Sequence, residues 1–277
     1  MILTVLNIEL DLNSVNVHGV NVSERSLTKI IYTPIAYRGL RRIKMSNTKN
    51  NGHDIDTILK RIMTDKHTIL SHKNDKMITS SIDGRYFLSW SITPVDTCPG
   101  ADKCKSGCFG LTGHYATPSV KMNLADNYTL SQSDLFVDIM TNEIRRYTYV
   151  KNLFIRVHAV GDFYDMDYLK KWVAIANNNP SVTFYAYTKS VMLFKEYGQL
   201  PNNMVVIYSY GGKYDNLINP DKDKIAVVFP TLESIPSGYV DCGDDDYNAI
   251  INQKTALVYH SNKKYENTNW SKVLVPQ

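Results

Sequence analysis

Three of the four cysteines lie within one short segment of the chain. Cys98, Cys104 and Cys108 follow a C-x5-C-x3-C spacing, while Cys242 is far away in the sequence. Four cysteines in a chain of 277 residues are too few for a disulfide scaffold. The segment is polar and rich in glycine, which lets a backbone wrap tightly around an inorganic group. Clustered thiols in such a loop predict a metal centre.

Several chemistries are open to these thiols. A 4Fe–4S cluster held by Cys98, Cys104 and Cys108 would keep one iron open for a small ligand. A structural zinc site needs four closed ligands, so His114 or Cys242 would have to complete it. A disulfide would leave one thiol over, and inert burial is unusual for three thiols in a polar loop. We expect the iron–sulfur cluster, with zinc as the alternative.

Further polar side chains lie on one face of the predicted strands. Residues 153–160 alternate, with apolar side chains on one face and Arg156 and His158 on the other. Lys189 ends a later strand of similar pattern, and Ser91 lies on the polar face of the strand that leads into the cysteine loop. A parallel strand covered on both faces is nearly all apolar, so a polar face indicates a lumen or cleft. We expect Arg156, His158 and Lys189 to be catalytic there and Ser91 to contact a cofactor. The alternatives are a structural network for Arg156 and His158 and a surface position for Lys189.

The elements that would position these side chains alternate between strands and helices. Strands are predicted at residues 86–93, 153–160, 182–188, 204–210, 225–229 and 256–260. Helices are predicted at residues 54–66, 131–147 and 191–197, and another is opened by Asp165. This order favours parallel βαβ units, and the polar strand faces favour a barrel-like α/β fold over an open doubly wound sheet. We place a boundary near residue 80, between an N-terminal α+β extension (1–80) and the main domain (81–277).

Composition and charge limit the class of protein. The chain is 43% hydrophobic and 21% charged, which is ordinary for a globular protein. The sequence shows neither a basic signal-peptide start nor an apolar run long enough for a membrane span, so we expect a cytoplasmic protein with reduced thiols. The net charge of +4 is too small to imply nucleic acid binding. The extension is basic, however, with its densest stretch at Arg38–Lys44. That stretch is either a solvated face or a contact to phosphates.

The motifs together resemble the first half of a radical S-adenosylmethionine enzyme. A strand leads into the cysteine loop, Phe109 follows the last cysteine, and a later strand ends in Gly161-Asp162. That superfamily has a partial (β/α)6 barrel, in which the cysteines hold a 4Fe–4S cluster. The resemblance implies that Cys98, Cys104 and Cys108 are the cluster ligands. It also implies that Gly161 and Asp162 contact the amino group of S-adenosylmethionine. The superfamily's usual motifs are C-x3-C-x2-C and Gly-Gly-Glu, so both motifs are variants here.

Three stretches resemble a second family more closely. Residues 97–110, 156–163 and 184–189 resemble the gene product 88 family of phage proteins. This resemblance implies a phage or prophage origin and a place in the cytoplasm of an infected or lysogenic host cell, but it implies no particular activity.

The resulting hypothesis is an iron–sulfur enzyme of the radical S-adenosylmethionine type. An electron from the cluster would cleave S-adenosylmethionine, and the 5′-deoxyadenosyl radical would take hydrogen from a substrate shielded by the barrel. A nucleotide or nucleic acid is the candidate substrate, an external electron donor is a required partner, and no membrane is involved. The alternative is a zinc-stabilised nucleic-acid-binding or interaction protein of a phage without catalytic activity.

Overall fold

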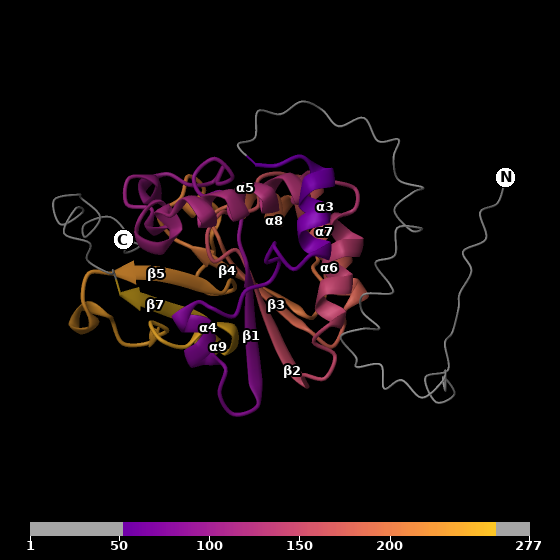
Figure 1. The fold of residues 1–277 in the computed structure, drawn as a ribbon. Coiled ribbons are helices and arrows are strands. Elements are labelled where there is room, and N and C mark those ends of the chain that lie inside the picture. The colour runs from indigo at the N-terminus through magenta and orange to yellow at the C-terminus, as the bar shows by residue number, and fades with distance from the viewer. Residues whose placement is uncertain (1–51, 259–277) are drawn as a thin grey trace. The chain divides into compact units, whose positions relative to one another are not determined.

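The computed structural model describes residues 52–258, and within that range a curled sheet of seven parallel strands forms half a barrel (Figure 1). The strand order is β1-β2-β3-β4-β5-β7-β6. Sequential strands are neighbours except at the last edge, where β7 lies between β5 and β6. The predicted mixed α/β class is confirmed. The sheet differs from a (β/α)6 barrel by its additional strand and by this exchange of order at the edge.

The bounds of the elements are as follows. The strands are β1 Arg85–Trp90, β2 Asn152–Val157, β3 Thr183–Thr188, β4 Met204–Ser209, β5 Ile225–Phe229, β6 Val240–Asp241 and β7 Lys254–Val258. The α-helices of the described range are α3 Ile55–Met63, α4 Asp75–Ser80, α5 Pro118–Gln132, α6 Phe136–Arg145, α7 Met166–Asn178, α8 Val191–Tyr197 and α9 Asp246–Ile251. The 3-10 helices are η1 Lys103–Lys105, η2 Phe109–Leu111, η3 Gly113–Ala116, η4 Asp215–Leu217 and η5 Leu232–Ser234.

Most predicted elements are present, but the helix predicted at residues 131–147 is wrong at its start. Helix α5 ends at Gln132, and Ser133 is extended with ψ of 147° before α6 begins. Ser131 therefore lies in the last turn of α5, where its hydroxyl donates to the carbonyl of Tyr128. Asp165 does open α7, since its carboxylate accepts a hydrogen bond from the amide of Tyr168. Residues 259–260 of the last predicted strand lie outside the described range.

Helices cover the outer face of the sheet. Trp90 of β1 contacts Phe136 of α6 and Trp172 of α7, with ring centroids 5.3 and 6.2 Å apart, and all three side chains are fully buried. Figure 1 shows α3, α6 and α7 together on this side of the sheet. Alternate side chains of β1 and β2 are apolar and point outward, and they form the sheet's side of this interface with the helices.

The inner face of the sheet is partly filled by α4 and α9, which lie against each other (Figure 1). Phe87, Tyr185 and Ile207 from the strands form a buried cluster with Met77 of α4 and Ala249 of α9. The inner face is therefore closed by a small apolar core at the middle of its strands. Polar side chains are found further toward the carboxyl ends, which is the end where α/β folds place chemistry.

Residues 52–80 pack onto the sheet domain, because α3 contacts α5 and α4 contacts β1. The basic stretch Arg38–Lys44 lies outside the described residues. In the part of the chain that is described, we find no helix that is both long and apolar enough to cross a membrane.

Candidate functional site

The cysteine segment lies across the carboxyl ends of β3 and β4. Gly100 packs so tightly that a Cβ there would overlap the carbonyl group of Lys189, and a Cβ on Gly212 would lie 2.8 Å from the oxygen of Gly100. A bridge between Ala101 and Gly212 and a 2.9 Å hydrogen bond from the Lys213 amide to the Gly100 carbonyl hold the loop there. The glycines thus allow close contact with the strand ends, which places the loop over the inner face.

The turn after β2 supports the same loop. Gly161 has φ of +89°, and a Cβ on it would lie 2.5 Å from Cγ1 of Ile92 and 3.1 Å from Oγ1 of Thr97, next to Cys98. Glycine is required at this turn by its backbone conformation and by the close approach. This is a positioning role, and it explains Gly161 without any contact to a cofactor.

Asp162 connects the ends of β2 and β3. Its Oδ1 accepts hydrogen bonds from the Thr188 hydroxyl at 2.6 Å and the Phe163 amide at 2.8 Å, while Oδ2 accepts from the Lys189 amide at 2.8 Å. The residue is 5% exposed, and burial raises the pKa of its carboxyl group. The sequence predicts that Asp162 receives the amino group of a cofactor. In the structure its oxygens accept hydrogen bonds from protein groups, so it fixes the strand ends beside the cysteine loop.

The three thiols share one electrostatic neighbourhood. Burial, with the charges of Asp162, Cys108 and Cys104 adding to it, raises the pKa of Cys98 to about 12. Burial also raises the pKa of Cys104 and of Cys108, whereas the charge of Lys189 acts on both in the opposite direction. All three are free thiols that are only partly exposed. They are therefore protonated at neutral pH, and a metal would have to displace the protons.

The donor types fit a thiolate-bound metal group, but they are not gathered around one point. Within residues 52–258, no group of three or more His, Cys, Asp or Glu side chains is close enough together to hold a metal ion. The candidate fourth ligands lie in other surroundings. Cys242 is fully buried in the apolar cluster between the sheet and α9, and His114 is exposed with its ring against Tyr115.

Lys189 connects the ends of β3 and β4. Its ammonium group donates hydrogen bonds to the carbonyl and the hydroxyl of Ser209, at 3.1 and 2.6 Å, and to the carbonyl of Tyr210 at 2.9 Å. These acceptors are neutral, and within the described range Lys189 forms no ion pair with a carboxylate. A positive charge is thus held beside Cys104 and Cys108.

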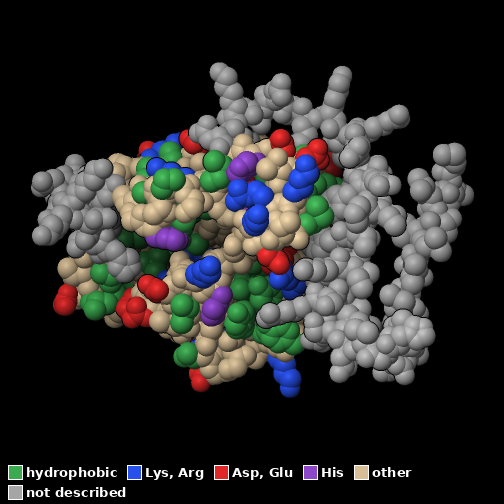
Figure 2. Space-filling view, viewed as in Figure 1, with side chains coloured by type: hydrophobic (Ala, Val, Ile, Leu, Met, Phe, Trp, Pro, Cys, Tyr) green, Lys and Arg blue, Asp and Glu red, His purple; other side chains and the backbone are tan. Residues whose placement is uncertain are grey.

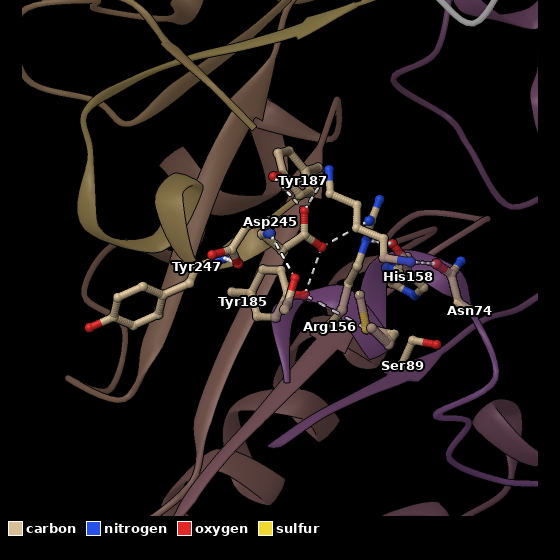
Figure 3. A network of polar contacts seen from close by, with 12 residues as sticks. Asn74, Ser89, Arg156, His158, Tyr185, Tyr187, Asp245 and Tyr247 are labelled. Carbon is tan, nitrogen blue, oxygen red and sulfur yellow. Dashed lines mark hydrogen bonds and ion pairs between the residues drawn. The ribbon is translucent and has the colours of Figure 1, made fainter. Parts of the chain in front are cut away.

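A second polar cluster lies on the inner face around Asp246 of α9, a fully buried carboxylate (Figure 3). Its Oδ2 accepts from Arg156 at 3.0 Å and from the Tyr185 hydroxyl at 2.8 Å. Its Oδ1 accepts from Lys76 at 2.8 Å and from the Tyr187 hydroxyl at 2.9 Å. Burial opposes ionisation of Asp246, but Arg156 and Lys76 beside it bring its pKa below the ordinary value. Arg156 thus faces the inner side of the sheet, as its strand pattern predicts.

Comparison with known protein families decides the identity of the chain. The model of the family described as "Gene product 88" matches residues 67–271, which is more than half of the chain. The chain belongs to the gene product 88 family. The match includes the cysteine loop, the polar contacts of Asp162 and Lys189, and the cluster around Asp246, so these features lie within the family domain. Searches of curated proteins and of solved structures give no match.

In this gene product 88 protein His158 does not share the face of Arg156. His158 has φ of +71°, so the chain turns directly after β2 and carries the ring to the outer side. There its Nε2 lies 2.9 Å from the Tyr168 hydroxyl, which accepts a 2.9 Å hydrogen bond from the Trp90 indole. Burial, with the charge of Arg156 adding to it, lowers the pKa of His158 to about 3. The ring is therefore neutral, and its surroundings are those of a core histidine.

Ser91 links the end of β1 to the turn after β2. Its hydroxyl accepts a hydrogen bond from the Val160 amide at 3.3 Å, and its carbonyl accepts one from Asn127 at 2.8 Å. The sequence predicts a cofactor contact for Ser91; the contacts observed here hold the strand end next to the cysteine loop.

Sequence reasoning missed two members of the inner cluster, Lys76 and Asp246. The run Asp244-Asp245-Asp246 favours a solvated turn, yet Asp245 caps α9 and Asp246 is buried. The signal that could have found them is the polar inner face itself, because a buried arginine needs a carboxylate partner.

The Gly211-Gly212 pair is a weak phosphate-binding motif in the sequence. In the structure the amides of both glycines donate hydrogen bonds to the carboxylate of Asp215, at 2.8 and 3.0 Å.

Proposed function

We propose that this gene product 88 protein is an iron–sulfur enzyme of the radical S-adenosylmethionine type, with a 4Fe–4S cluster held by Cys98, Cys104 and Cys108. The observation that carries the proposal is the placement of these thiols. The three thiols interact electrostatically with one another, and Lys189 acts on Cys104 and Cys108, on a loop fixed over the carboxyl ends of parallel strands. A cluster distributes its thiolates over several iron atoms, so it does not require sulfurs that meet at one point.

The chain's own residues have defined tasks in this proposal. When bound, a cluster with three cysteine ligands supplies an electron and an open iron position for a small ligand. Lys189 provides positive charge that favours the thiolate forms of Cys104 and Cys108. Gly161 and Asp162 keep the loop in place through the strand ends. The inner face below the loop would receive the substrate, and Figure 2 shows a hollow between the α5 layer and the strands below it.

Metal analysis of anaerobically prepared protein tests the cluster. We expect about four iron and four sulfide per chain in the wild type. The variant Cys104→Ala should lose most of this iron. The matched control is Cys242→Ala, which removes a thiol from the apolar core and should keep the iron content of the wild type. One tightly bound zinc per chain, lost in Cys104→Ala, would contradict the proposal and favour a zinc-stabilised binding protein.

A second measurement tests the reaction type. Cluster-loaded protein that is reduced with dithionite in the presence of S-adenosylmethionine should release 5′-deoxyadenosine, and Cys104→Ala should release none above background. If fully loaded wild-type protein also releases none, the cluster has another role and the proposed enzyme type is wrong.

A further inference from the structure

The buried cluster on the inner face holds more positive charge than its carboxylate requires. Asp246 carries one negative charge, while Lys76 and Arg156 both lie within ion-pair distance of it, at 2.8 and 3.0 Å. The hydroxyls of Tyr185 and Tyr187 also donate to Asp246. One cation and two hydroxyls would have satisfied this carboxylate. A second buried cation is costly to desolvate unless another anion lies nearby, so the cluster has the charge of an anion-binding site.

Both cations keep donors that are free to bind a ligand. Arg156 uses Nη1 for Asp246 and Nε for the carbonyl of His158, at 3.0 and 3.3 Å, and Nη2 makes no hydrogen bond to any other residue within 52–258. Lys76 gives one of its three N–H groups to Asp246. The two side chains are 14% and 17% exposed, so they are largely desolvated but still reachable. Donors of this kind bind oxyanions strongly, because charge-assisted hydrogen bonds are not fully screened there.

The geometry around the two cations is fixed. Both lie over the ring of Tyr187, at 4.9 Å for Arg156 and 5.9 Å for Lys76. Figure 3 shows Asn74 on the Arg156 side of this cluster, and the Asn74 amide lies 3.5 Å from the hydroxyl of Tyr115, which follows the cysteine loop. Tyr187 precedes Lys189 by two residues at the end of β3, and Lys189 lies beside the cysteine loop. The Asp246 cluster and the cysteine loop are therefore neighbours along β3.

We propose that Lys76 and Arg156 bind an oxyanion, a phosphate or carboxylate group, of a small ligand on the inner face. The oxyanion would be a group of the enzyme's substrate, and only this assignment to the substrate rests on the proposed function. The anion binding itself needs neither a cluster nor S-adenosylmethionine, so it can be measured in metal-free protein.

Titration calorimetry of metal-free protein with inorganic phosphate, and separately with acetate, tests the site. We expect saturable binding of at least one of them, weakened tenfold or more in Lys76→Gln, because glutamine keeps a donor to Asp246 but removes the charge. Lys170→Gln is the matched control, since Lys170 is exposed on α7 and pairs with Asp167; its binding should equal that of the wild type. Cys104→Ala should also bind like the wild type, which separates this result from any failure of the cluster.

A thermal melt gives an independent reading. Asp246→Asn removes the carboxylate that competes with a bound anion. Phosphate should therefore raise the melting temperature of this variant more than it raises that of the wild type. Chloride at equal ionic strength is the reference for both proteins. Absence of saturable binding, equal binding by the wild type and Lys76→Gln, or equal phosphate effects on the wild type and Asp246→Asn would each overturn the proposal. The relative affinities for phosphate and acetate show which oxyanion the site prefers.

Discussion

At the scale of single residues, the polar side chains divide according to the face of the sheet they reach. Arg156 and His158 are two positions apart in the sequence, yet one binds Asp246 on the inner face and the other binds Tyr168 on the outer face. The positive φ of His158 causes this separation. Alternation along a strand predicts side-chain direction only while the backbone stays extended, so a prediction made across a strand end fails.

Replacement of the buried carboxylate tests the energetics of the inner cluster. In Asp246→Asn the charges of Lys76 and Arg156 lose their buried partner, so the free energy of unfolding should fall by about 3–5 kcal/mol. The control is Asp167→Asn, whose side chain is 86% exposed and pairs with Lys170 on the surface; its effect should stay within about 0.5 kcal/mol. Urea unfolding at low phosphate measures both. Equal effects of the two substitutions would show that the cluster contributes no more than a surface ion pair.

At the scale of elements, glycines decide how the connecting segments pack on the sheet. Gly100, Gly161 and Gly212 each lie where a Cβ would press against a neighbouring strand end or loop. The cysteine loop can therefore rest directly on β3 and β4, and the turn after β2 rests on the segment before Cys98. Short elements such as β6 and α9 complete the inner face, although they are too short to give a clear period in the sequence.

Two matched glycines separate packing from backbone strain. Gly161 and Gly198 have similar φ values, +89° and +85°, but a Cβ would meet Ile92 at Gly161 and open space at Gly198. Gly198 combines φ of 85° with ψ of −118°, a backbone region that alanine rarely adopts, so Gly198→Ala should cost about 1–3 kcal/mol of stability. Gly161→Ala should cost about 1–3 kcal/mol more, because its Cβ would also overpack against Ile92. We also expect lower iron content in Gly161→Ala and unchanged iron content in Gly198→Ala. Chemical denaturation and metal analysis of both proteins check this, and equal costs would contradict the described packing of the turn.

At the scale of the whole domain, the two faces of the sheet bury different titratable groups. The inner face contains paired charges, whereas the outer face buries His158, whose pKa burial and the Arg156 charge lower to about 3. In the unfolded chain a histidine has a pKa near 6.5. Between these values the unfolded chain binds the additional proton, so acid favours unfolding. The stabilising effect of a neutral His158 is complete above about pH 6.5 and is lost progressively as the pH falls toward 3.

Substitution of this histidine should flatten the acid side of the stability profile. His158→Gln can still accept a hydrogen bond from Tyr168 but does not titrate. The free energy of unfolding of the wild type should fall relative to the variant by up to about 1.4 kcal/mol per pH unit below pH 6. Unfolding experiments between pH 4 and 8 give this difference. Parallel curves would show that the pKa of His158 is the same in the folded protein as in the unfolded chain.

The amino-acid sequence by itself determined the α/β class, six of the strands, the capped start of α7 and the cysteine loop, because these depend on local periodicity and local spacing. Only the tertiary structure decided the partners of the polar residues. Asp246 meets Arg156 and Lys76 through contacts between segments 90 and 170 residues apart, and Asp162 meets the end of β3 across a whole helix. Such pairs form where the sheet curls and brings distant segments together, and a hydrophobic pattern along one segment contains no information about which charge lies opposite.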